Sequence, residues 1–281
     1  HGSSGTRIAP VPHLCRAYAV RHMKKSLLLL ALCVFTVAKA QHDRINTRGS
    51  IGWFNYFGTV KLSEKWGLHT EYQWRRDQVV AGWQQSLLRV GINHQLTPSV
   101  LLRGGYGWIE TYPYGELPIN GLGRAFTEHR LFQMAQLTSR EGRLEFAHRF
   151  MLEQRFVGRY SRSDLDREDE YPLLHRARYM LRLQLPLKGP MVVDHSTYVA
   201  VYNELFIGFG HQVNANVFDQ NRFGALIGHR FSPLLRIEGG YLNQVLQFGR
   251  EIQGRNVFQY NQGIILNALF TFAKEAPRLP Q

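Results

Sequence analysis

The stretch WGLHTEYQWR, residues 66–75, decides the fold. Successive side chains of a β-strand point to opposite faces, so its alternate residues form two sets. One set is mostly apolar: Trp66, Leu68, Thr70, Tyr72 and Trp74. The other is small, polar or charged: Gly67, His69, Glu71, Gln73 and Arg75. One face therefore suits lipid and the other suits water, over about the ten residues that a tilted transmembrane strand needs.

The same period of two recurs in ten further segments, least cleanly in 128–137. These segments are 51–62, 88–95, 100–108, 128–137, 143–153, 176–185, 197–207, 222–231, 234–244 and 258–272. Short connections alternate with long polar ones, as in outer-membrane barrels. The short ones are 63–65, 97–99, 139–142, 187–195 and 232–233, and the long ones are 76–82, 113–126, 157–172, 208–220 and 245–256. The sequence thus predicts an all-β, transmembrane, antiparallel up-and-down β-barrel with a polar lumen rich in Arg and Glu.

The number of strands is a separate prediction. Eleven segments conflict with the even strand number of single-chain bacterial barrels. Residues between Gln41 and Gly52 could add a short strand or run through the lumen, or one segment could be wrong. We predict twelve strands, with ten as the alternative.

The N-terminal region carries an export signal. Met23 to Ser26 is basic, residues 27–37 are apolar, and Ala38 and Ala40 are small, in the order of a secretory signal peptide. We therefore predict a signal peptide over 23–40, a barrel over 41–272 and a tail over 273–281. Cleavage before Cys33, as in a lipoprotein, is the weaker alternative because Leu32 is bulky. We expect residues 1–22, a tag remnant or an over-extended reading frame, to be disordered.

Removal of the first 40 residues changes the composition. The full chain has a formal net charge of +13, but 28 basic and 21 acidic residues remain after cleavage, a net of +7. Both cysteines precede Gln41, which excludes a disulfide or a thiolate metal site from the mature chain. Export and the absence of a clustered basic helix argue against nucleic-acid binding. No apolar stretch after Gln41 has the length of a transmembrane helix.

The alternation places a set of charged residues on the inward face. They are Glu71, Arg75, Arg89, Arg103, Glu145, Arg149, Glu153, Arg155, Arg176, Arg178, Arg182, Arg222 and Glu238. On the lipid face each midplane arginine would cost about 2–4 kcal/mol. Two interpretations stay open: an Arg-rich wall of a narrow, anion-favouring pore, or a plug of paired Arg and Glu side chains that fills the lumen. The interleaved signs favour the plug.

Catalytic and metal sites are not indicated. An outer-membrane hydrolase would need a histidine beside a serine, and the strand candidates His69, His129, His148 and His229 have no evident serine partner. Neither G-x-S-x-G nor H-E-x-x-H occurs. We therefore expect no enzyme, no metal and no cofactor.

Three further features concern the ends of the strands. Most aromatic residues there are typical of membrane-interface girdles: Trp53, Trp66, Trp74, Trp83, Trp108, Tyr56, Tyr72 and Tyr112. In the segment from Asp219 to Arg222 we expect turn hydrogen bonds, with a local ion pair or a ligand contact as alternatives. The alternation that ends at Phe272 looks like the C-terminal signal of barrel assembly, although residues 273–281 follow it.

The mature chain resembles a family of uncharacterised Gram-negative outer-membrane proteins that is known only as a domain of unknown function. The matching stretches are 62–71, 105–108, 143–145 with 152–156, 216–222 and 239–244. The resemblance implies a barrel in the outer membrane and no assigned activity. We expect it to contact outer-membrane lipid and lipopolysaccharide, and the barrel-assembly machinery during insertion. The alternatives are an outer-membrane lipid-modifying hydrolase and a soluble periplasmic ligand-binding β-protein.

Overall fold

Eleven strands make up the described part of the chain. A computed structural model describes residues 44–213 and 216–273; the predicted segments 1–22 and 23–40, and the tail after Ala273, lie outside these residues. The strands are β1 (Arg44–Lys61), β2 (Trp66–Asp77), β3 (Gly82–Thr97), β4 (Val100–Thr111), β5 (Phe126–Glu141), β6 (Leu144–Val157), β7 (Leu173–Pro186), β8 (Ser196–Phe209), β9 (Phe218–Arg230), β10 (Leu235–Ile252) and β11 (Arg255–Ala273). Among the described residues, no helix has the length and apolar character needed to cross a membrane.

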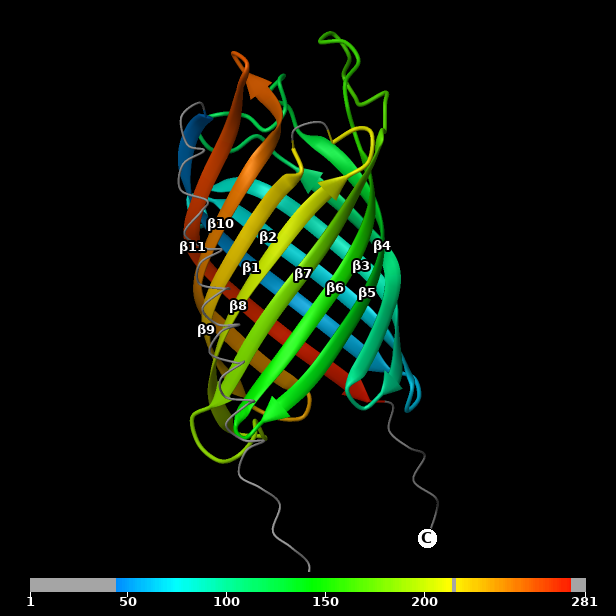
Figure 1. The fold of residues 1–281 in the computed structure, drawn as a ribbon, viewed down its shortest axis with the longest axis vertical. Helices are drawn as coiled ribbons and strands as arrows, with labels where there is room; N and C mark the ends of the chain where they lie inside the picture. Colours follow the sequence, from blue (N-terminus) through cyan, green and yellow to red (C-terminus); the bar gives the residue numbers. More distant parts are fainter. Residues whose placement is uncertain (1–43, 214–215, 274–281) are drawn as a thin grey trace, which may run out of the picture. The chain divides into compact units, whose positions relative to one another are not determined.

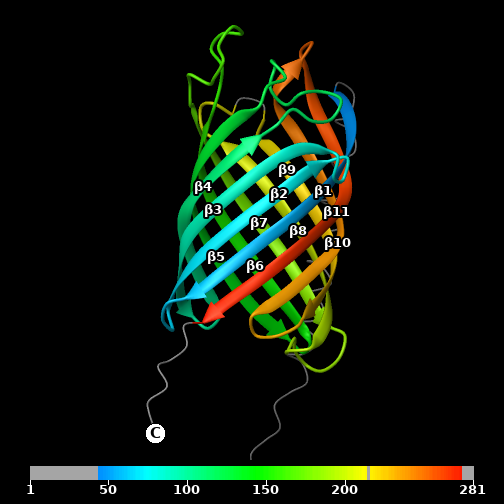
Figure 2. The ribbon, with the colours of Figure 1, turned by 180° about the vertical axis from the view of Figure 1, so that it is seen from behind.

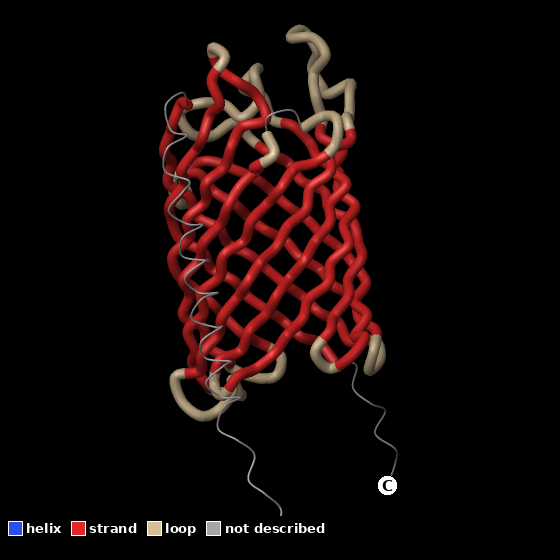
Figure 3. Tube along the Cα trace, in the orientation of Figure 1, coloured by secondary structure: helices blue, strands red, loops and turns tan. Residues whose placement is uncertain are grey.

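The strands form one closed barrel in chain order, and each is antiparallel to the next (Figure 1). Figure 3 shows that strands make up the wall, while turns and loops lie at its two ends. We call these the short-turn end, where β1 meets β2, and the long-loop end, where β4 meets β5.

The prediction of twelve strands, with ten as the alternative, is wrong for the described residues. Each of the eleven alternating segments forms one strand, and residues 44–50 lengthen β1 instead of forming a twelfth. An odd number of successively antiparallel strands leaves the first and last running in the same direction. The barrel therefore closes through a parallel pair, and the arrowheads of β1 and β11 lie at the same end in Figure 2.

Side-chain geometry fixes the register of this closing seam. Asn55 donates a hydrogen bond from Nδ2 to Oδ1 of Asn267 over 2.8 Å, across a separation of 212 residues. Gly263 lies against the backbone of Ile51, which is the same separation. Two contacts with one constant offset are the signature of parallel pairing.

Two of the predicted long loops, 76–82 and 245–256, are instead short turns, because the flanking strands extend into them. The β2–β3 connection is only Gln78–Ala81, and β10 and β11 meet in a two-residue hairpin at Gln253 and Gly254, with φ of 52° and 71°. Two positive φ values match the type I′ turn that suits the twist of a hairpin. The 245–256 segment looked like a loop because it is polar, yet its Gln247 side chain is buried inside the barrel.

Candidate functional site

The centre of the lumen is organised around the carboxylate of Glu153 on β6, which is fully buried. Strand pairing places Glu153 opposite Arg176 on β7. Its oxygens lie 2.6 Å from Nη2 of Arg176 and 2.7 Å from Nη1 of Arg178. Arg89 and Arg130 approach from β3 and β5, at 3.7 and 3.8 Å. Four arginines thus converge on one carboxylate.

Further ion pairs extend this cluster along the inner wall. On β2, Glu71 accepts from Nη1 of Arg89 at 2.9 Å. On β8, Glu204 lies 2.7 Å from Nη2 of Arg178 and 2.9 Å from Nη2 of Arg149. Charged side chains therefore link β2, β3, β6, β7 and β8.

A second layer of ion pairs lies toward the long-loop end. Glu128 on β5 pairs with Arg130 and, at 2.7 Å, with Nε of Arg155. Asp219 on β9 lies 2.7 Å from Nη1 of Arg176 and 3.4 Å from Nη1 of Arg155. The two layers share Arg176, so they form one network.

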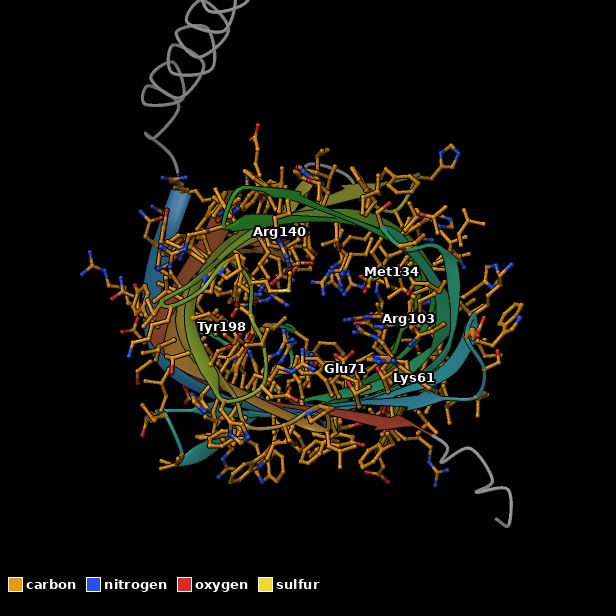
Figure 4. All side chains as sticks on the ribbon, turned by 90° about the horizontal axis from the view of Figure 1, so that it is seen from below. Lys61, Glu71, Arg103, Met134, Arg140 and Tyr198 are labelled. Atoms are coloured by element: carbon orange, nitrogen blue, oxygen red, sulfur yellow. The ribbon has the colours of Figure 1, made fainter. Side chains whose placement is uncertain are left out.

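Toward the short-turn end the pairs become more exposed. Arg182 on β7 reaches Glu238 on β10 at 2.5 Å, and the hydroxyl of Tyr198 donates to the same carboxylate over 2.7 Å. Nearer the rim, Glu145 pairs with Arg140 at 2.9 Å, and both side chains are partly exposed. Figure 4 looks along the barrel and shows Glu71, Arg103 and Tyr198 on the lumen side of the wall.

Ten of the thirteen predicted inward charges thus form ion pairs with another side chain. Arg75, Arg103 and Arg222 do not: no described carboxylate lies within 4.0 Å of their guanidinium groups. Their hydrogen bonds go to amide oxygens instead, for example from Nε of Arg103 to Asn93 and from Nε of Arg222 to Gln220.

The sequence analysis missed four members of the network: Glu128, Arg130, Glu204 and Asp219. Glu128 and Arg130 share their inward face with Phe132, so the alternation of β5 looked irregular. The expectation of turn hydrogen bonds at Asp219 is wrong, because β9 already begins at Phe218 and the carboxylate joins the network. A search for inward acids opposite unpaired arginines would have pointed to the three acids, Glu128, Glu204 and Asp219.

The lumen also contains aromatic and apolar side chains. Phe206 is fully buried beneath the guanidinium groups of Arg176, Arg178 and Arg222, whose Cζ atoms lie 4.4–5.1 Å from the ring centroid. Trp53, predicted in an interface girdle, is 3% exposed and points inward; that prediction is wrong. It packs in an apolar cluster of β1, β8, β9, β10 and β11 that fills the side of the lumen near the seam. Side chains, and not only water, therefore fill this part of the lumen.

A cavity of about 730 Å³ opens above this network, inside the long-loop end. Its floor includes Glu128, Arg155 and Asp219, and its walls include Arg75 and Arg222. Small-molecule sites occupy about 300–1,000 Å³, so the cavity has the size of a ligand site.

The loops above the cavity are tied to one another. Arg250 on β10 donates from Nη2 to the carbonyl of Pro118 over 2.6 Å, and Tyr160 donates to the carbonyl of Ala125 over 2.8 Å. In the β6–β7 loop, Ser161 donates to Asp169 through its amide, and the hydrogen bonds from Ser161 lower the pKa of Asp169. Burial raises the pKa of Tyr114, a loop residue on the cavity wall, so its hydroxyl stays neutral.

The candidate histidines have phenol, hydroxyl or carboxylate neighbours. His148 and His129 contact the hydroxyls of Tyr179 and Tyr106 on the outer surface, at 2.9 and 2.5 Å. His229 contacts the Thr197 hydroxyl, and His69 lies 3.2 Å from Glu71. Ser86 donates its hydrogen bond to Tyr72. Within the described ranges, no group of three or more His, Cys, Asp or Glu side chains is placed to hold a metal ion.

Comparison with known proteins identifies a family to which no activity is assigned. No curated protein and no solved structure matches the chain. Residues 51–254, which run from the first half of β1 to the β10–β11 hairpin, match the family described as protein of unknown function DUF2490. Since this match covers well over half of the sequence, the chain belongs to the DUF2490 family, whose members share a domain of unknown function.

Proposed function

We propose that this chain is an integral outer-membrane β-barrel whose lumen is closed by side chains, so that it works as a sealed barrel with a cup at the long-loop end and not as an open pore. The distribution of side chains between the two faces of the wall carries the proposal. Large apolar side chains are exposed on the outside, while glutamates and arginines are buried inside. A water-soluble barrel needs the opposite arrangement.

The outer face supports contact with lipid. Every strand from β2 to β11 carries exposed large apolar side chains, and examples are Ile92 and Ile227, both 57% exposed. An apolar surface that extends over these ten strands far exceeds the patches that soluble monomers expose. The hydrocarbon core of a bilayer would cover such a belt.

Polar side chains on the outer face pair with one another. Gln133 and Gln154 exchange hydrogen bonds of 3.2 Å across β5 and β6. Asn203 and Asn221 do the same across β8 and β9, at 3.0 and 3.1 Å. An amide facing hydrocarbon needs such a partner because no water can supply one.

Aromatic side chains gather on the outer face near both ends of the barrel. Near the long-loop end, the ring centroid of Trp83 lies 6.2 Å from that of Trp74 and 5.3 Å from that of Tyr112. Near the short-turn end, the ring of Trp66 packs against that of His94 in a tilted arrangement, with centroids 4.3 Å apart. Trp66 and Trp74 are separated by about 26 Å of strand at ~3.3 Å per residue, which for a strand tilted by about 40° spans about 20 Å of height, most of the apolar band of about 25 Å in outer-membrane barrels.

Closure of the lumen rests on the ring of contacts around its inner wall. Ion pairs connect Glu71 on β2 to Glu204 on β8 through the Glu153 cluster. On the opposite side, Arg222 on β9 and Arg75 on β2 both lie against Trp53 on β1. A small barrel filled in this way leaves side chains where a channel would be.

Conductance in planar lipid bilayers tests the closure. We expect the refolded wild-type protein to give no channel events. The variant Glu153→Ala with Arg178→Ala removes one acid and one base from the centre, and we expect discrete channel events from it. The control, Arg140→Ala with Glu145→Ala, removes a pair at the rim and is expected to stay silent. Steady wild-type conductance would overturn the closed lumen.

Substitution of two equally exposed surface residues tests whether the apolar belt lies in a membrane. Ile92 in the belt and Val80 in the β2–β3 turn are both 57% exposed. In lipid vesicles, Ile92→Arg is expected to lower the free energy of unfolding by about 2–4 kcal/mol, and Val80→Arg by less than about 1 kcal/mol. Urea unfolding measures both. Equal, small effects would mean that water covers the belt.

The proposal includes the route to the membrane. Export depends on the leader over 23–40, and the aromatic end of β11 at Phe272 is the segment we expect the barrel-assembly machinery to bind. In the membrane, the long-loop end faces outward and contacts lipopolysaccharide. We propose no catalytic role, because among the described residues none of the four candidate histidines contacts a serine.

A further inference from the structure

We infer that the cavity at the long-loop end binds a small soluble anion with at least two negative charges, such as pyrophosphate or a tricarboxylate. This inference goes beyond the sealed barrel proposed above and holds for the folded protein in detergent as well as in a membrane. The cavity has a volume of about 730 Å³, sufficient for such an ion with its remaining hydration.

The charge of the cavity wall is strongly positive. Seven arginines line it, against only two carboxylates, those of Glu128 and Asp219. Both carboxylates are already engaged by Arg155, and Arg130 and Arg176 also pair with Glu153 beneath the cavity. Among the described residues, four lining arginines then remain without an ion pair: Arg75, Arg159, Arg222 and Arg250. The remaining positive charge is concentrated in a recess with low-dielectric walls, an arrangement that attracts anions.

Arg75 and Arg222 are the arginines that an anion would bind. They are only 5% and 8% exposed, and no described carboxylate lies within 4.0 Å of either guanidinium group. Arg75 donates to Gln73 and, over 2.5 Å, to Gln85, and Arg222 donates to Gln220. These amides hold the side chains in place, while Glu71 and Glu204 act on the two guanidinium groups only from beyond 4.0 Å, so neither charge has a carboxylate in contact. A buried charge without a counter-charge is costly, so an anion in the cavity would relieve this cost.

Trp53 brings the two arginines to one place. The Cζ atoms of Arg75 and Arg222 lie 4.0 and 4.8 Å from its ring, although their strands are not neighbours in the barrel. The indole Nε1 donates to Gln84 over 2.7 Å, which fixes the orientation of the ring. Two guanidinium groups that both lie against this one ring can each offer donors to an oxyanion bound beside it. Two negative charges on the ligand therefore match the site better than one.

The position of the site sets its direction of access. Loop residues Ile119 and Leu122 line the cavity on one side, and the ion pairs of Glu128 and Asp219 lie beneath it. A ligand therefore enters and leaves through the long-loop end, and the site captures the anion without passing it through the barrel.

Titration of the refolded protein in detergent micelles tests the inference. Pyrophosphate, citrate, phosphate and chloride are added separately, and binding is followed by calorimetry and by the fluorescence of Trp53, the most buried of the tryptophans. We expect pyrophosphate and citrate to bind, phosphate to bind more weakly and chloride not to compete. Arg75→Gln and Arg222→Gln should each weaken pyrophosphate binding at least tenfold, and the double variant should abolish it.

The matched control is Arg103→Gln. Arg103 also points inward and has no described carboxylate within 4.0 Å, but it does not line the cavity. The affinity of the Arg103→Gln variant for pyrophosphate should stay within twofold of that of the wild type. Trp53→Phe keeps an aromatic ring against the two arginines, so calorimetry should still detect binding, while the anion-dependent change in fluorescence should be lost.

Three results would overturn the inference. They are no binding of any of these anions by the folded wild-type protein, equal affinity in the Arg75→Gln and Arg222→Gln variants, and binding only of lipid-linked phosphate when phosphatidic acid is mixed into the micelles. Membrane insertion is measured separately, so a failed titration leaves the sealed outer-membrane barrel standing, and a failed insertion assay leaves the anion site standing.

Discussion

Glu153→Gln is expected to destabilise the barrel by about 3–5 kcal/mol, because it leaves buried arginines without their shared counter-charge. The carboxylate is fully buried and lies within 2.7 Å of both Arg176 and Arg178, with Arg89 and Arg130 within 3.8 Å. A neutral amide of the same size keeps the packing but provides no negative charge. Equilibrium unfolding in urea, from vesicles or micelles, measures the loss.

The control for this prediction is Glu145→Gln. Glu145 also points into the lumen, but it lies near the rim, where its side chain is 29% exposed and that of its partner Arg140 is 38% exposed. Exposed pairs contribute about 0–1 kcal/mol, so little loss is expected. If both variants unfolded at the same urea concentration, the central cluster would not be a source of stability.

Gly263→Ala is expected to prevent correct closure of the barrel. A Cβ atom at this position would lie 1.7 Å from the carbonyl oxygen of Ile51, and the backbone of β1 would have to move to make room. Overpacking of this kind costs about 1–3 kcal/mol in a core and more where backbone must shift, so we expect a loss of at least about 3 kcal/mol. Refolding yield, followed by the heat-dependent gel mobility of folded barrels, measures the effect.

Gly107→Ala is the matched control for the seam. Gly107 also faces inward, on β4, and an added Cβ would meet its nearest neighbour at an ordinary 3.6 Å. This variant should fold with wild-type yield. Normal folding of Gly263→Ala would show that β1 and β11 are not in close contact in the folded protein.

Much of the fold could be predicted from local pattern alone. Segments such as 66–75 and 176–185 alternate cleanly because their outward residues are apolar and their inward ones are polar, and each forms a strand. The alternation gave eleven segments, and only the general rule of even strand numbers raised the prediction to twelve. A local pattern could not predict how the first and last strands pair, because their contact joins residues 212 positions apart.

Prediction of the site residues also depended on regular alternation, so residues on irregular strands were missed. Charges on regular strands, such as Glu153 and Arg178, were named from sequence, and they lie in the network. Glu204 was missed because its inward neighbour Phe206 is aromatic and obscures the pattern of β8. Pairing between strands, which decides which arginines remain without a carboxylate, is a three-dimensional property. The cavity and its two buried, unpaired arginines could therefore not be predicted.

The odd number of strands has a consequence for sidedness. β1 starts at the long-loop end and β11 finishes at the short-turn end, so Arg44 and Ala273 lie on opposite sides of the barrel. In the proposed orientation, an epitope inserted just before Arg44 would be displayed to antibodies on intact cells. One appended after Ala273 would be reached only once the outer membrane was permeabilised, whereas an even-stranded barrel hides both.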